Sequence, residues 1–171
     1  YAQEERDNQP QLTRDHSLFP LRSTGIWTEV HPLIPRVIYF GVHFANADTG
    51  WAVGEGGAII KTTNGGSNWN SQISGTTEAL YSITFVNSNI GWIVGWNGTI
   101  LKTTDGGITW FPQFSGLTTY LFSVQFTNVN TGWVVGSGGT ILGTTNGGDS
   151  WQQQSSGTNW PLFSVSLTDE N

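Results

Sequence analysis

The sequence predicts an all-β protein made of β-propeller blades, each a sheet of four antiparallel strands. Three observations support this prediction. Aromatic residues recur every 41 positions along the chain. Each repeat holds four short segments rich in β-branched and aromatic residues, separated by turns of Gly, Asn and Asp. No repeat shows the apolar period of a helix. Four strands in a unit of about 40–45 residues are typical of a propeller blade.

Three sets of landmarks share the 41-residue period without drift. They are Trp51, Trp92 and Trp133, then Trp69, Trp110 and Trp151, and then Phe40, Tyr81, Phe122 and Phe163. Residues 81–121 match residues 122–162 at 21 of 41 positions. This identity indicates duplication of one unit, and it disfavours a β-solenoid, whose coils are shorter, or a sandwich, which has no fixed period.

The units set the expected boundaries along the chain. Complete blades are predicted over 40–80, 81–121 and 122–162, and in the last of these the strands are FSVQF (122–126), WVVG (133–136), ILGTT (141–145) and WQQQSS (151–156). Residues 1–24 form a polar arm, 25–39 a partial blade that supplies an outer strand, and 163–171 a partial blade that supplies a first strand. Two explanations of the partial blades stay open. Either the chain is a fragment of a longer propeller, or a neighbouring copy completes the half-blades and builds a ring or a filament.

The turn between the third and fourth strands carries the same motif in every unit. The copies are Thr62, Asn64, Gly66 and Trp69, then Thr103, Asp105, Gly107 and Trp110, and then Thr144, Asn146, Gly148 and Trp151. We expect the Asn or Asp side chain to accept hydrogen bonds from backbone N–H groups two residues on, and each Gly to adopt positive φ. The Trp is expected to be buried between blades. Two of the three copies have Asn in place of Asp, so the motif is predicted to be structural rather than a metal site.

These turns resemble the Asp box of the BNR repeat, S/T-x-D-x-G-x-T-W. The wider pattern, F-x-x-x-x-x-GW-x-VG-x-x-G-x-I-x-x-TT-[DN]-GG-x-x-W, is similar to the photosystem II stability/assembly-factor-like repeat family over residues 40–169. The resemblance implies a propeller of about seven blades. Its named members assist photosystem assembly, and most bacterial members are secreted or surface proteins. Family members are described with an arginine-rich patch, whereas no arginine follows Arg36 in this chain.

Composition and charge exclude several classes of partner. The formal net charge is -6, and only Lys61 and Lys102 are basic after Arg36, so no basic surface is expected for nucleic acid or an anionic membrane. There is no Cys, and no apolar run is long enough to span a membrane. The sequence begins at Tyr1, which a removed signal peptide or a shortened chain would explain. Absence of Cys does not fix the compartment, and the family resemblance implies a secreted, periplasmic or cell-surface protein.

Catalytic chemistry is not predicted. A sialidase, which shares the Asp box, needs an arginine clamp, and the repeats contain no arginine. A retaining glycosidase needs two nearby carboxylates. Glu55 and Glu78 are the only Glu residues in the complete units and are expected to be solvated loop acids. His16, His31 and His43 lack the spacing of metal ligands, and His43 is expected to be a polar residue on a strand. We predict no catalytic residue, metal or cofactor.

Comparison of the units points instead to a binding surface. Two loops vary between units: the turn between the second and third strands, and the connection to the next blade. In propellers these two loops lie at the same end of the blade. Trp96, Tyr120 and Trp160 are therefore expected to gather on one rim and to bind a protein or a glycan. Local loop packing is the alternative for these rings. Asn97 opens an Asn-Gly-Thr glycosylation sequon in the same turn.

The predicted function is thus a non-catalytic module that binds a protein or glycan through its loops. The alternatives are a structural subunit that self-assembles through its terminal strands, and a chaperone resembling photosystem assembly factors.

Overall fold

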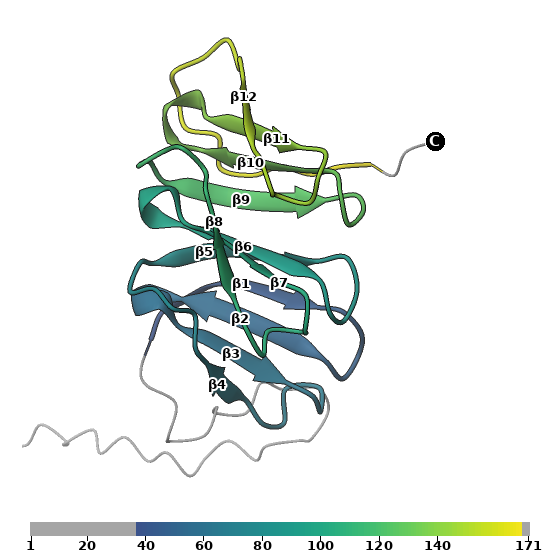
Figure 1. The fold of residues 1–171 in the computed structure, drawn as a ribbon. Coiled ribbons are helices and arrows are strands. Elements are labelled where there is room, and N and C mark those ends of the chain that lie inside the picture. The colour runs from purple at the N-terminus through teal and green to yellow at the C-terminus, as the bar shows by residue number, and fades with distance from the viewer. Residues whose placement is uncertain (1–36, 169–171) are drawn as a thin grey trace, which may run out of the picture.

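The computed structural model describes residues 37–168, which fold into three four-stranded antiparallel sheets. The first blade contains β1 (Tyr39–Phe44), β2 (Gly50–Gly54), β3 (Ile59–Thr62) and β4 (Asn70–Gln72). The second contains β5 (Leu80–Phe85), β6 (Gly91–Gly95), β7 (Ile100–Thr103) and β8 (Phe111–Gln113). The third contains β9 (Leu121–Phe126), β10 (Gly132–Gly136), β11 (Ile141–Thr144) and β12 (Gln152–Gln154). The three blades are stacked in chain order, and consecutive strands pair within each of them (Figure 1).

The strands agree with the predicted all-β propeller blades and differ from the sequence prediction only near their ends. The first strands begin at Tyr39, Leu80 and Leu121, one residue before the predicted unit boundaries. Single 3₁₀ turns, η1 (Glu55–Gly57), η2 (Trp96–Gly98) and η3 (Ser137–Gly139), join the second and third strands. The second strand pairs on both sides and is almost wholly buried, which explains its continuous apolar sequence in each unit.

The partial blade predicted at 163–171 does not form a strand over its described residues. Residues 162–168 run alongside the third blade, where the Leu162 N–H donates to the Gly136 carbonyl and the Val165 N–H donates to the Ser123 hydroxyl. A first strand pairs only with the second strand of its own blade, and within residues 37–168 no such strand lies beside this segment. The segment therefore lacks a ladder of backbone hydrogen bonds. The polar arm predicted at 1–24, residues 25–36 and residues 169–171 lie outside the described part of the chain.

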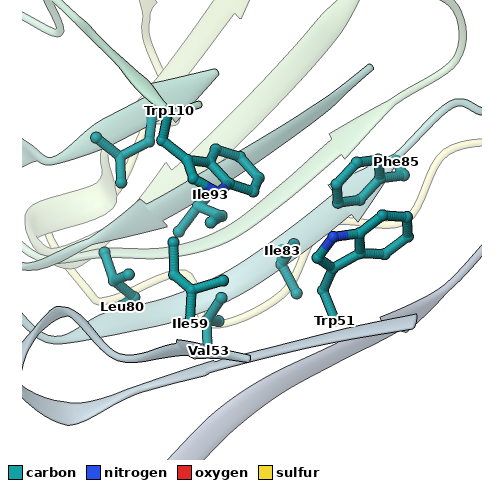
Figure 2. Close-up of a cluster of buried hydrophobic side chains, with 9 residues drawn as sticks. Trp51, Val53, Ile59, Leu80, Ile83, Phe85, Ile93 and Trp110 are labelled. Carbon is teal, nitrogen blue, oxygen red and sulfur yellow. The ribbon is translucent and has the colours of Figure 1, made fainter. Parts of the chain in front are cut away.

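Each pair of neighbouring blades shares an apolar core of its own. The indole of Trp51 stacks on the ring of Phe85, with centroids 3.7 Å apart, and Trp92 stacks on Phe126 at 3.5 Å. Trp110 contacts Phe85 edge-on from the Asp box of the same blade. Figure 2 shows Trp51 of the first blade beside Phe85 of the second, with Trp110 in the same cluster of buried side chains. Trp51 and Trp92 thus lie at the contacts between blades. Of the Asp-box tryptophans that were expected to be buried there, only Trp110 is buried, whereas Trp69 and Trp151 are half-buried.

The same tryptophans also tie each blade to the Asp box of the next. The Trp51 indole N–H donates to the Gly106 carbonyl at 3.1 Å, and the Trp92 N–H donates to the Gly147 carbonyl at 3.0 Å. The Lys61 ammonium donates to the Gly106 carbonyl as well, at 2.8 Å. The two indole bonds are buried, whereas the Lys61 bond is partly buried, so loss of a carbonyl acceptor would leave an unpaired indole N–H group in the core.

Within each Asp box, two side chains close the turn. The Thr103 hydroxyl accepts from the Gly107 N–H at 2.9 Å, and the Asp105 carboxylate accepts from the Thr109 N–H at 2.9 Å and the Thr109 hydroxyl at 2.5 Å. The bond to an N–H two residues on, expected of the Asn or Asp, is made by the Thr hydroxyl instead. The bonds from Thr109 lower the pKa of Asp105 to about 2. Asn64 and Asn146 accept the same backbone bond without a charge.

We predict that replacing Trp92 by Phe destabilises the protein by about 2–4 kcal/mol, because the change removes a buried hydrogen bond and opens a cavity. Trp133 occupies the same position in the third blade, but it is partly exposed and its indole has no hydrogen-bond partner within residues 37–168. The matched change Trp133→Phe is expected to cost about 1 kcal/mol or less. Urea unfolding of both variants measures the difference, and equal losses would contradict this role for the indole N–H.

We predict that Asp105→Ala lowers the free energy of unfolding by about 1–2 kcal/mol, whereas Asp105→Asn preserves the turn as Asn64 and Asn146 do. The pKa of Asp105 is lower in the folded chain than its usual 3.8, so its charge stabilises the fold above that pH and this contribution is lost as pH falls toward 2. The Asn variant lacks this term, and its stability should fall less steeply between pH 4 and pH 2. Thermal unfolding at several pH values measures both slopes; parallel slopes would disprove the assignment.

Candidate functional site

The two ends of the blades carry different loops. At one end, the turns between second and third strands lie against the connections between blades, since the Trp96 N–H donates to the Ala79 carbonyl and the Ser137 N–H donates to the Tyr120 carbonyl. We call this the connection end. At the other, the Asp-box end, the Gly106 N–H donates to the Asn89 carbonyl in the loop between first and second strands. The variable loops singled out by sequence therefore lie together, away from the Asp boxes.

A β-bulge places one aromatic ring from each blade at the connection end. The pairing of the first and second strands shifts register at Phe40, Tyr81 and Phe122. A bulge re-aims the side chain of its extra residue. The ring centroids are 5.3 Å apart from Phe40 to Tyr81, 5.9 Å from Tyr81 to Phe122, and 5.1 Å from Phe122 to Phe163. These rings form a line that crosses all three blades and reaches the segment after them.

The bulge depends on a glycine in the second strand. Gly95 lies opposite the bulge, and a Cβ atom at this position would lie 2.2 Å from the Ala79 carbonyl oxygen. Gly54 and Gly136 are equally close to the carbonyls of Ile38 and Tyr120. The repeated Gly of the G-W-x-V-G segment therefore permits the chain crossing that positions the line of rings.

Two of the three rim residues predicted from sequence join this line. Trp96 and Tyr120 stack with centroids 5.7 Å apart and planes 5° from parallel. Tyr120 also lies 5.9 Å from Phe122 and 6.4 Å from Tyr81. Trp96 and Tyr120 are 46% and 42% exposed, so they are packed against neighbours and open to solvent at once.

The third predicted residue does not join it. Trp160 is 80% exposed, and within residues 37–168 its ring contacts no other aromatic ring. We define the aromatic row as the six rings in mutual contact: Phe40, Tyr81, Trp96, Tyr120, Phe122 and Phe163. Sequence reasoning used four of these only as landmarks of the repeat. The signal that could have found them was the aromatic residue repeated at the start of each first strand.

The charges of the described residues are divided between the two ends. Lys61 and Lys102 are the only Lys or Arg residues from 37 to 168, and both act at the Asp-box end, where Lys102 lies 3.5 Å from the Asp149 carboxylate. Glu55 and Glu78 lie at the connection end, Glu55 exposed and Glu78 partly buried. The Glu78 carboxylate accepts from the Asn97 amide at 3.5 Å. Among the described residues, the aromatic row thus lies beside acids and away from cations.

The pKa of Tyr81, a ring of the aromatic row, is affected by its surroundings at the connection end. Burial raises the pKa of Tyr81, and the neighbouring Tyr120 and Glu78 raise it further. A raised pKa keeps this hydroxyl protonated and neutral throughout the physiological range.

Asn97, the first residue of the sequon, is exposed. Its φ is positive, at 57°, and the glycines at the same position of the other two blades also have positive φ. The aromatic row and the sequon therefore occupy the same end of the blades.

Apart from the aromatic row, the described residues hold little reactive chemistry at either end of the blades. His43 is half-buried on β1 with its ring 5.8 Å from that of Phe85, and burial lowers its pKa. From 37 to 168, no three His, Cys, Asp or Glu side chains come close enough to hold a metal ion. A hollow of about 690 Å³ lies beside the first blade, and the described residues that line it include no acid, His, Lys or Arg. No helix in the described part of the chain is long and apolar enough to cross a membrane.

Comparison with known proteins places this architecture among propellers. Among solved structures, the chain is similar to YCF48 bound to D1 peptide, with 24% identity and a TM-score of 0.62, over 68% of this chain and 40% of that one. YCF48 from Cyanidioschyzon merolae is 26% identical with a TM-score of 0.62, over 70% and 41%. The GH74 enzyme of Niastella koreensis is 18% identical with a TM-score of 0.65, over 76% and 24%, which shows a shared fold alone. No curated protein matches the chain.

The chain spans about two fifths of the length of the YCF48 structures that it resembles. The family described as photosynthesis system II assembly factor YCF48 matches residues 20–110 and 72–161. The matched residues include the three Asp boxes and the four-stranded blades that carry the aromatic row. Since these matches cover most of the sequence, the chain belongs to the YCF48 photosystem II assembly-factor family of β-propellers.

Proposed function

We propose that this protein is a non-catalytic module that binds a polypeptide partner at its connection end, in the manner of an assembly factor. The observation that carries the proposal is the aromatic row, in which Trp96 and Tyr120 stack at 5.7 Å while staying almost half exposed. Rings that are held in place by neighbours lose little side-chain entropy on binding, and they are common anchors of protein interfaces. One related structure, that of YCF48 bound to D1 peptide, supports a peptide as the kind of ligand.

The arrangement of the rings favours a polypeptide over a glycan. A sugar stacks on the open face of an aromatic ring, and the ring of Tyr120 already lies within 18° of parallel to those of Trp96 and Phe122. A peptide needs only the exposed edges and the gaps between rings, where proline or aliphatic side chains can pack. The row also crosses consecutive blades, which suits an extended chain.

The same end offers support for a binding role without catalysis. Among the described residues, the acids at the connection end are Glu55 and Glu78. The Glu78 carboxylate accepts a hydrogen bond from the Asn97 amide, and no His or second carboxylate in residues 37–168 is hydrogen-bonded to it. General acid–base catalysis needs a proton donor and acceptor within reach of one substrate. The rings supply contact area instead, and binding is the chemistry that they favour.

A second candidate function, self-assembly, has its own supporting observation. Val42 and Phe44 on the first blade are 58% and 37% exposed, whereas Ile83 and Phe85, at the same positions of the second blade, are 6% and 7% exposed. We propose a second copy of the chain as the partner that covers this surface, because another blade already does so within the chain. Sedimentation of the intact protein and of Val42→Asp tests it; a strict monomer at high concentration would exclude it.

We predict that Tyr120→Ala and Trp96→Ala each weaken peptide binding about 10-fold or more, as removal of a central aromatic anchor does. Binding is measured on an array of overlapping peptides that includes the D1 peptide, with a glycan array beside it. Trp160→Ala is the matched control, since it removes an exposed ring that is outside the aromatic row. Unchanged peptide binding by both row variants, or binding to glycans alone, would contradict the proposal. Circular dichroism confirms that each variant keeps its fold.

A further inference from the structure

The acids beside the aromatic row indicate the charge of its ligand. Glu78 lies in the connection that leads into β5, where its carboxylate accepts from the Asn97 amide at 3.5 Å and influences the Tyr81 hydroxyl. Within residues 37–168, Glu78 and Glu55 have no salt-bridge partner, since the one salt bridge there joins Lys102 to Asp149 at the Asp-box end. An acid that is partly buried and lacks a cation attracts a positively charged partner.

The chain itself shows how a cation and an indole combine in this fold. The Lys61 ammonium lies 5.2 Å from the ring centroid of Trp51, and the Lys102 ammonium lies 5.8 Å from that of Trp92. Both lysines are thereby occupied between blades, at the Asp-box end. At the connection end, the half-exposed rings of Trp96 and Tyr120 have no cation from the described residues above them. A ligand that brings its own ammonium or guanidinium group would supply this contact.

The two junctions between blades differ in charge, and the difference indicates where a cationic ligand would bind. At the junction of the first and second blades, Glu78 faces Asn97. At the next junction the position of Glu78 is taken by Thr119, whose hydroxyl hydrogen-bonds to the Ser137 hydroxyl. The first junction is therefore charged and open to a cation, whereas the second is neutral and satisfied by its own side chains.

From these observations we infer that the aromatic row binds a cationic segment, in which lysine or arginine alternates with proline or aliphatic residues. The apolar residues pack between the rings, and one basic side chain lies against Trp96 and Tyr120 with its charge toward Glu78. This inference rests on the proposed function, because it assigns the charge of the polypeptide that the row would bind. It names a class of sequence rather than one protein.

Three synthetic peptides test the inference with the intact chain. They share an alternating proline and leucine framework and differ only in carrying lysine, serine or glutamate between these residues. Fluorescence anisotropy at moderate salt is expected to give the lysine peptide an affinity at least about 10-fold above that of the glutamate peptide. Raising the salt concentration should weaken the lysine peptide alone.

Two variants assign the effect to Glu78. Glu78→Thr installs the residue that the next blade already has at this position, so the fold should be kept, and it is expected to weaken binding of the lysine peptide about 3–10-fold without changing that of the serine peptide. Asp48→Asn removes the same charge at the exposed Asp-box end and should change neither.

The outcomes separate the two proposals. If the serine peptide binds as tightly as the lysine peptide, or if Glu78→Thr binds lysine peptide normally, the assigned charge is wrong and the binding function stands. Equal weakening by Asp48→Asn would reduce the effect to net charge and would also overturn the site. If none of the three peptides binds, and the peptide array is also blank, both the inference and the proposed function fail.

Discussion

The contact between one blade's tryptophan and the next blade's Asp box is the constraint on which this structure depends. Trp51 and Trp92 each use their ring and their N–H group in different directions. The ring stacks on a Phe of the following blade, which sets the spacing between sheets. The N–H group donates to a Gly carbonyl of the following Asp box, which prevents the sheets from sliding. A stack alone is tolerant of sliding, whereas a buried hydrogen bond has a narrow geometry and is costly to break.

The aromatic row at the other end of the blades follows from this fixed spacing. One bulge per blade brings one ring to the connection end, and the regular separation of the three blades then sets these rings 5.3 and 5.9 Å apart. The blades themselves thus hold the rings of Phe40, Tyr81 and Phe122 in line. Trp96 and Tyr120 extend it at one place only, where the repeat does not dictate the residue. In this way a repeated framework gains a single distinctive site.

The contact between blades also explains why the lysines lie at one end of the blades and Glu55 and Glu78 at the other. At the Asp-box end, Lys61 is held by the Gly106 carbonyl and the Trp51 ring, and Lys102 by Asp149 and the Trp92 ring, so the inter-blade contacts use both cations of the described blades. The acids of the connecting loops are left without them. The proposed binding surface and the contacts that hold the blades together therefore lie at opposite ends of the same sheets, so the loops of the connection end can vary without disturbing those contacts.

The sequence by itself determined the fold, because the aromatic, Gly and Asp-box positions recur every 41 residues and each unit holds four strand-like segments. This pattern is typical of repeated four-stranded blades. The sequence also located Trp96 and Tyr120, since residues that differ between near-identical units stand out. Only the tertiary structure decided that the rings of Phe40, Tyr81, Phe122 and Phe163 contact one another in sequence and that the ring of Trp160 contacts none of them. A bulge depends on the pairing of two strands, and the contact between rings depends on the spacing between sheets. Neither quantity is local to any stretch of sequence, and for that reason neither could be read from the residues alone.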